Sequence, residues 1–152
     1  MRTIKKLDAS HVDKWAKISA NAFPGMGINS AEEMERFKER IAKRLDQIDV
    51  HPFGLFEADE LMGIMRLFDF TLNLHGHEVP VGGLGSVAVD LVHKKEKVAK
   101  DMVSYFVKHY QEQGACFTAL YPFRPYFYKK MGFGYGTPVT HYTIDPASFP
   151  KS

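Results

Sequence analysis

The sequence predicts a mixed α/β domain in which a mostly antiparallel central sheet carries helices on both faces. After a short first strand, hydrophobic residues recur at helical spacing up to about residue 48, and they alternate with a period of two from about residue 53. The second half then reads as strand, helix, strand, short helix and strand. This order of elements is typical of a sheet covered on both faces, and by itself it is compatible with several folds.

The first 48 residues predict one strand and two helices. Residues 3–7 form the short strand, and Ser10 is the expected N-cap of a helix that ends near residues 22–27, where proline and glycine interrupt the pattern. Ser30 and Glu33 have the spacing of a capping box, so a second helix is expected to run to about residue 48. The apolar stripe of this second helix is Met34, Phe37, Ile41 and Leu45.

The middle of the chain predicts antiparallel strands. Residues 53–58 and 61–73 alternate in hydrophobicity around a turn, and Gly63 is a candidate bulge within the second strand. A turn at residues 74–80 leads into a strand at 81–89. His75, His77 and Glu78 in that turn are interpreted as solvated polar chain, and no metal site is expected.

The last third predicts a long helix followed by two strands and a short helix. The long helix runs to about residue 113 and is closed by Gly114. Residues 115–121 read as a buried strand containing Cys116, and a short helix runs from Pro125 to residue 131. We expect residues 133–144 to form the final strand and close the sheet.

Composition places the chain in an ordinary class. Its 152 residues predict one domain, and 45% apolar with 25% charged residues is typical of globular proteins. A net charge of +2 gives no case for a nucleic-acid or membrane partner. The single cysteine excludes an internal disulfide, and no apolar run has the length of a signal peptide or a membrane span. We therefore expect a cytoplasmic protein.

The stretch from residue 81 to residue 100 has the features of an anion site. An apolar strand ends at Val89 and a turn leads to the basic run Lys94-Lys95-Glu96-Lys97, read as the start of the long helix. The first turn of a helix exposes backbone N–H groups and carries a partial positive charge. By itself, however, such a basic run is also typical of a solvated helix start.

Two segments resemble a known family. Val87-Ala88-Val89, followed by a turn, a basic pair and a helix, is similar to the acyl-CoA motif of the GNAT superfamily of N-acetyltransferases. The segment from Tyr126 to Gly136 resembles that superfamily's "fYekfGF" segment. More narrowly, its run Tyr-x-x-Met-Gly-Phe-Gly-Tyr-Gly resembles the N-terminal domain of the enhanced-intracellular-survival (Eis-type) acetyltransferases. The resemblance implies a GNAT-like fold for the whole chain.

The resemblance also implies a site for acetyl-CoA as co-substrate, with no metal. Tyr128 would be the general acid that protonates the departing thiolate. Lys97 stands where the family pattern has glycine, and it is the main departure from that pattern. The implied cofactor-binding residues are Val87, Ala88, Val89, Lys94, Lys95, Lys97, Val98, Ala99, Lys100, Phe123 and Arg124.

The function implied is an acyltransferase that moves acetyl from acetyl-CoA to a primary amine by direct attack. The acceptor would be an amine of a small molecule or of a protein. Because Eis-type relatives assemble as oligomers, the resemblance also allows a homo-oligomer. The resemblance to Eis-type proteins implies that the catalytic base is the C-terminal carboxylate of a longer, multidomain chain. The present sequence ends at about the place where the second domain of that family would begin. It is therefore interpreted as a single acetyltransferase domain that could be the N-terminal fragment of such a chain. The alternative is a non-catalytic acyl-CoA-binding or interaction module.

Overall fold

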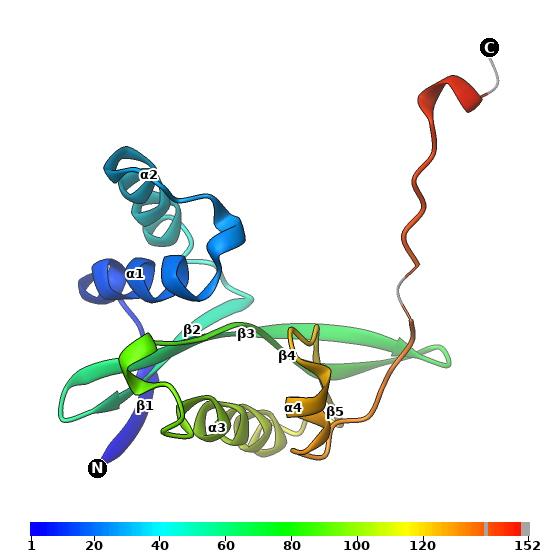
Figure 1. Cartoon of the computed structure of the whole chain (residues 1–152). Helices are drawn as coiled ribbons and strands as arrows, with labels where there is room; N and C mark the ends of the chain where they lie inside the picture. The colour runs from blue at the N-terminus through cyan, green and yellow to red at the C-terminus, as the bar shows by residue number, and fades with distance from the viewer. Residues whose placement is uncertain (139, 150–152) are drawn as a thin grey trace. The chain divides into compact units, whose positions relative to one another are not determined.

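The computed structural model describes residues 1–138 and 140–149 and divides them between two compact units. The first unit is Met1–Tyr121 and the second begins at Pro122. All the strands and the three long helices found in the described residues belong to the first unit (Figure 1). Each unit is considered by itself.

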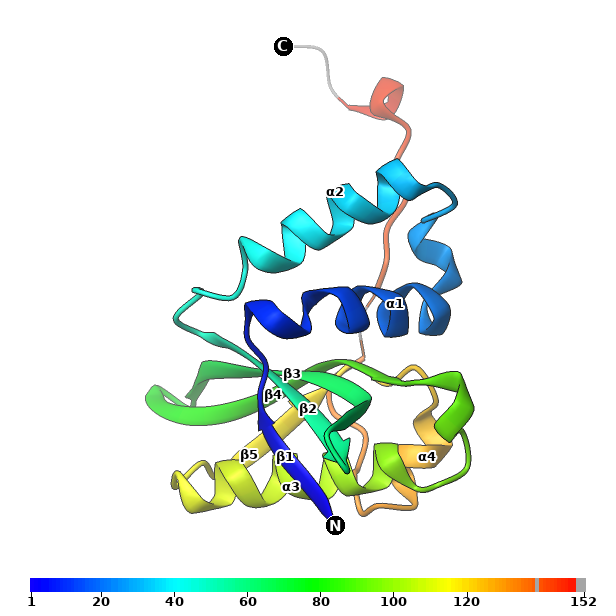
Figure 2. The ribbon, with the colours of Figure 1, turned by 90° about the vertical axis from the view of Figure 1, so that its left-hand side faces the viewer.

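The first unit is a five-stranded sheet with helices on both faces (Figures 1 and 2). Its strands lie in chain order, antiparallel from β1 to β4, and β5 runs parallel to β4. Helices α1 and α2 cover one face and α3 covers the other. This arrangement confirms the predicted fold class. The strands are β1 (Arg2–Lys6), β2 (Val50–Glu57), β3 (Glu60–Leu74), β4 (His77–Val89) and β5 (Phe117–Leu120).

The N-terminal helices are α1 (Val12–Ala22) and α2 (Ala31–Ala42), each preceded by a short 3-10 turn, η1 (Ala9–His11) or η2 (Pro24–Met26). Asp8 caps η1, and its carboxylate accepts from the Ser10 N–H. The N-cap of α1 is His11, which makes no side-chain capping hydrogen bond, so the prediction that Ser10 caps this helix is wrong. The predicted capping box of α2 is confirmed, with the Glu33 N–H donating to Ser30 Oγ at 3.1 Å.

The core between α1, α2 and the sheet follows the predicted stripes. Phe37 and Ile41 of α2 are buried there, while Met34 packs against the cluster in a partly buried position. Helix α2 ends before residue 48, yet Leu45 still packs on the core from the turn that follows. The buried residues of this core cluster are Leu7, Trp15, Ala16, Ile18, Phe37, Ile41, Phe56, Leu61, Ile64 and Ala88.

The opposite face is covered by α3 (Val98–Glu112), which packs close to the sheet because glycines lie beneath it. A Cβ on Gly63 would come within 2.9 Å of side-chain atoms of Val98 and Met102. A Cβ on Gly82 would overlap the Tyr110 ring. A register shift between β2 and β3 lies next to Gly63, as the predicted bulge requires.

The C-terminal third departs from prediction in two places. Residues 133–138 and 140–145 form no strand, so the expectation that 133–144 closes the sheet is wrong. Glycines and Pro138 interrupt the alternation there, and proline cannot donate to a strand ladder. Cys116 is exposed and precedes β5, whose four residues are exposed or partly buried, so the prediction of a buried strand at 115–121 that contains Cys116 is wrong.

The second unit contains one short helix, α4 (Pro125–Lys129), and a 3-10 turn, η4 (Pro146–Ser148), among its described residues. The turn after α4 is closed at Gly132, whose φ of 95° is a left-handed conformation that favours glycine. Across residues 1–138 and 140–149, no helix is long and apolar enough to cross a membrane.

Candidate functional site

The candidate site begins where β4 loses its regular pairing. Between the pairs Arg66–Gly85 and Ile64–Ala88, β4 carries one residue more than β3. Ser86 lies in this bulge and has a φ of 52°, which is uncommon for a residue other than glycine. Bulges bend the strand that carries the extra residue, so the C-terminal half of β4 is turned out of the regular ladder.

Within residues 1–138 and 140–149, this half of β4 also has no strand partner on its other edge. β5 pairs with β4 only from Val81 to Leu84, where β5 ends at Leu120. From Gly85 to Val89, β4 therefore continues without pairing to β5. Unpaired strand N–H and C=O groups can bind an extended polar ligand by its amides. Val87, Ala88 and Val89 lie in this segment, and since the Ala88 side chain is buried in the core, its backbone is the part available.

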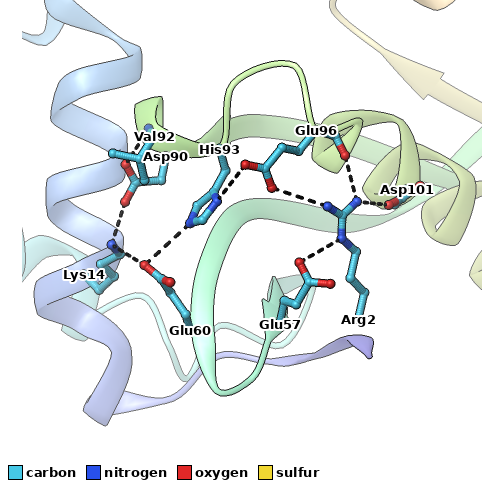
Figure 3. Close-up of polar contacts among 9 residues, drawn as sticks. All are labelled: Arg2, Lys14, Glu57, Glu60, Asp90, Val92, His93, Glu96 and Asp101. Carbon is cyan, nitrogen blue, oxygen red and sulfur yellow. Dashed lines mark hydrogen bonds and ion pairs between the residues drawn. The ribbon is translucent and has the colours of Figure 1, made fainter.

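After β4 the chain makes a 3-10 turn, η3 (Leu91–His93), which Asp90 fixes in place. The Asp90 carboxylate accepts from the Lys14 ammonium at 2.6 Å and from the Val92 N–H at 3.4 Å (Figure 3). The bond from Lys14 lowers the pKa of Asp90, against an opposing effect of burial. This contact ties the end of β4 to α1.

The basic run forms a loop and not the start of a helix. Helix α3 begins only at Val98, so the prediction that residues 94–97 open the helix is wrong by one turn. Lys95 has a φ of 81° and Lys97 a φ of 64°, both left-handed. Glycine adopts this conformation without strain, so Lys97 has the backbone shape expected of the glycine that it replaces.

The N-terminus of α3 has backbone donors without a partner inside the helix. Lys97 is its N-cap and its side chain makes no capping hydrogen bond, and the first turn's bond runs from the Asp101 N–H to the Lys97 carbonyl at 3.0 Å. The N–H groups of Val98, Ala99 and Lys100 precede that bond and have no partner within the helix. Together with the helix dipole they favour an anion at this end.

The charge around the loop is positive. Within the described part of the chain, the side chains of Lys94, Lys95, Lys97 and Lys100 are exposed and make no ion pair. Glu96 stands among them, but its carboxylate reaches Arg2 Nη2 at 3.5 Å and His93 Nδ1 at 3.3 Å (Figure 3). Its negative charge is therefore compensated by Arg2 of β1, and His93 of η3 lies on its other side.

The remaining predicted residues lie in the second unit. Tyr128 is half-buried on α4 and packs edge-to-face against Phe127 and Phe133, with ring centroids 5.0 and 6.0 Å away. Partial burial raises the pKa of Tyr128, so its hydroxyl keeps its proton at neutral pH. Phe123 and Arg124 are exposed, and the Arg124 guanidinium lies 5.8 Å from the Phe123 ring.

The structure thus gathers the predicted residues of the first unit along one path, from the β4 edge to the N-terminus of α3. Sequence reasoning missed Arg2 and His93, which contact this path. Arg2 lies 94 residues from Glu96 and 99 from Asp101, so no local pattern could have connected them. Among residues 1–138 and 140–149, no group of three or more His, Cys, Asp or Glu is arranged to hold a metal ion.

Comparison with known families gives the class of the protein. Residues 3–136 match the family described as the acetyltransferase (GNAT) domain. The chain belongs to this family, and its membership supports acyl transfer as the general activity. No curated protein sequence matches the chain significantly.

Solved structures share the fold at low identity. A transcriptional regulator from Bacillus halodurans C-125 superposes with a TM-score of 0.78 at 12% identity, covering 95% of this chain and 100% of its own. A predicted acetyltransferase from Clostridium acetobutylicum, solved with acetyl-CoA, has a TM-score of 0.72 at 13% identity, covering 94% and 96%. A GCN5-related N-acetyltransferase from Kribbella flavida has a TM-score of 0.69 at 20% identity, and the match covers 87% of this chain and 33% of that one.

Proposed function

We propose that this chain transfers acetyl from acetyl-CoA to a primary amine. The observation that carries the proposal is the continuous path from the unpaired β4 edge at Gly85–Val89 to the free N–H groups of α3. Its first part suits the amides of a pantetheine arm. Its second part, with four lysines that form no ion pair in the described residues, suits a diphosphate.

The proposed reaction is a direct attack. The amine nitrogen bonds to the thioester carbonyl carbon and the carbon–sulfur bond breaks. The Tyr128 hydroxyl donates its proton to the departing thiolate, and the proton lost by the amine returns to the phenolate through water. A phenol whose pKa is raised by burial is protonated before each turnover, which is the state that a general acid requires.

The finer features of the proposal rest on the resemblance. The acceptor is a small-molecule or protein amine, and the similarity of residues 128–136 to Eis-type acetyltransferases favours that branch of the family. The chain spans about a third of the Kribbella flavida protein, at 33%. We propose that residues 1–152 act as one acetyltransferase domain, in the cytoplasm, and that a larger protein or a homo-oligomer could complete the acceptor pocket.

Lys97 favours a second candidate, a module that binds acyl-CoA without catalysis. Its side chain occupies the position where the family pattern has glycine, beside the N–H groups proposed for phosphate. A cofactor site that lacks the family's glycine could bind acyl-CoA without supporting turnover. The two candidates share the same ligand and differ in turnover.

The test is a thermal melt of the full chain with acetyl-CoA, followed by a thiol-release assay with a panel of amines. A ligand present at about 100 times its Kd should raise the Tm by roughly 5–10 °C. Stabilisation with amine-dependent thiol release supports the enzyme, and stabilisation without release supports the binding module. Absence of a shift at millimolar acetyl-CoA rejects both.

A further inference from the structure

Arg2 joins segments that are far apart in the sequence. It lies at the start of β1, and its Nη1 donates to the Glu96 carbonyl oxygen and to Asp101 Oδ2, both at 2.8 Å (Figure 3). Its Nε contacts Glu57 of β2 at 3.4 Å. One guanidinium thus connects the sheet to both the loop before α3 and the first turn of α3.

The loop has a specific need for such a connection. Lys95 and Lys97, on either side of Glu96, both have left-handed backbones. This conformation is unfavourable for residues other than glycine. A loop of this shape persists only where surrounding contacts hold it. The bond from Arg2 to the Glu96 carbonyl acts on the residue between the two left-handed positions.

Arg2 also compensates the negative charge nearest the anion site. Glu96 lies within the loop and Asp101 in the first turn of α3, so two carboxylates flank the free N–H groups. Arg2 pairs with both, at 3.5 Å to Glu96 and 2.8 Å to Asp101. Without these pairs, both carboxylates would oppose an approaching phosphate.

His93 holds the loop from its other side. Its Nδ1 lies 3.3 Å from the Glu96 carboxylate, and its buried Nε2 lies 3.5 Å from Glu60, next to the turn between β2 and β3. Glu96 is therefore held between β1 and η3. The Glu96 carboxylate is thus directed toward Arg2 and His93, while the loop lysines form no ion pair in the described residues.

We propose that Arg2 is a positioning residue for the diphosphate of acetyl-CoA: it shapes the loop at residues 94–97 and neutralises its carboxylates without contacting the ligand. The inference rests on the proposed function for the identity of the anion. It also makes a prediction about the loop that needs no ligand.

The first test compares CoA with acetyl-pantetheine, which lacks the diphosphate. The Arg2→Ala variant should bind CoA roughly three- to tenfold more weakly than the wild type, because the ion pairs that this substitution removes are partly exposed. Its affinity for acetyl-pantetheine should be unchanged. The matched control is Arg36→Ala, which removes an exposed arginine whose partner is Glu32 on the same helix, and it should alter neither affinity.

The second test is hydrogen exchange in the chain without ligand. The Glu96 N–H is bonded to the His93 carbonyl and the Asp101 N–H to the Lys97 carbonyl. Both amides should exchange about tenfold faster in Arg2→Ala, because loosening the loop raises their opening equilibrium. The Phe23 N–H, bonded to Ser19 at the end of α1, should keep its rate. If Arg2→Ala does not fold, Arg2→Lys keeps the charge, loses the forked geometry and should show smaller changes in the same direction.

The outcomes separate the two proposals. An equal loss of affinity for both ligands, or unchanged loop exchange and unchanged CoA affinity, overturns the role of Arg2. If the wild type binds neither ligand, the proposed function fails, while the exchange rates of Glu96 and Asp101 still decide whether Arg2 positions the loop.

Discussion

Tyr128 carries its hydroxyl in a partly buried aromatic cluster, and the neighbouring Tyr126 provides a comparison. Tyr126 is 69% exposed on the same short helix. Replacing Tyr128 by Phe keeps the ring packing against Phe127 and Phe133 and removes only the proposed acid. We expect kcat to fall by about 100-fold or more with CoA affinity nearly unchanged, because a general acid acts in the chemical step. Tyr126→Phe should retain full turnover in the same thiol-release assay, and equal rates for the two variants would remove Tyr128 from the mechanism.

Asp90 gives a pH-dependent prediction at the end of β4. Hydrogen bonding to Lys14 lowers the pKa of Asp90 in the folded chain, so the carboxylate contributes stability above its unfolded value, near pH 4, and loses it as pH falls through the folded value. Asp90→Asn should lower the free energy of unfolding by about 1–2 kcal/mol at pH 7. In urea titrations this difference should shrink below about pH 4. A difference that stays constant with pH would contradict the ion pair.

At the scale of residues, the sequence indicated which residue types form the candidate site but not the backbone conformation of those residues. It identified the cations and the β4 segment because both are contiguous. It did not show that Ser86, Lys95 and Lys97 have positive φ, because these residue types carry no preference for it. It also did not show that Glu96 is compensated by Arg2, since that contact depends on β1 lying beside the loop.

The loop before α3 makes a prediction about backbone strain. Lys97 has a φ of 64°, so Lys97→Gly should relieve a left-handed conformation that costs an L-residue about 1–2 kcal/mol. After the greater flexibility of glycine in the unfolded chain is subtracted, we expect a net gain of roughly 0.5–1 kcal/mol in urea unfolding.

Lys94 is the matched control for this substitution. It has a φ of −63° and an extended backbone, so glycine relieves nothing there. Lys94→Gly should destabilise the chain by about 0.5–1 kcal/mol through the unfolded state alone. Opposite signs for the two variants are expected, and a loss of stability in both would argue against strain at Lys97.

The contact between α3 and β4 depends on Gly82. A Cβ there would overlap the Tyr110 ring, and that ring is fixed because its hydroxyl donates to Asp69 Oδ1 at 2.7 Å. Gly82→Ala should therefore cost about 2 kcal/mol or more, in the range of overpacked cores. Gly25→Ala, at a site with nothing within 4 Å of the added carbon, should change stability by less than about 0.5 kcal/mol. Similar denaturation midpoints for both variants would mean that α3 can shift away from the sheet.

At the scale of elements, hydrophobic periodicity predicted most of the helices and strands. It failed where the formation of a strand depends on a neighbouring strand to pair with. The capping box and the stripe of α2 are local features, and both are found. The strand expected at 133–144 contains aromatic residues and threonines typical of strands, but it forms no ladder in the described residues. Strand preference reflects packing against cross-strand partners more than intrinsic propensity, so a single segment cannot predict whether a partner exists.

At the scale of the whole chain, the core and the proposed acid lie in different units. The buried hydrophobic side chains found in the described residues all lie between Leu7 and Tyr110, inside the first unit. The β4 edge and the loop before α3 also lie there. Tyr128 lies in the second unit, together with Phe123 and Arg124. Folding and diphosphate binding should therefore be separable from acetyl transfer.

A chain ending at Tyr121 tests this separation. Because it keeps the entire buried core, we expect cooperative thermal unfolding with a Tm within about 5 °C of the full chain. Acetyl-CoA should still raise that Tm, by less than in the full chain if Arg124 contributes a phosphate contact. Thiol release should be lost, since the proposed acid is absent. The full-length Tyr128→Phe variant is the control, because it removes the same hydroxyl and keeps the second unit. A truncated chain that is unfolded by circular dichroism would show that residues after 121 complete the core, and one that still releases thiol at the full rate would place the catalytic acid in the first unit.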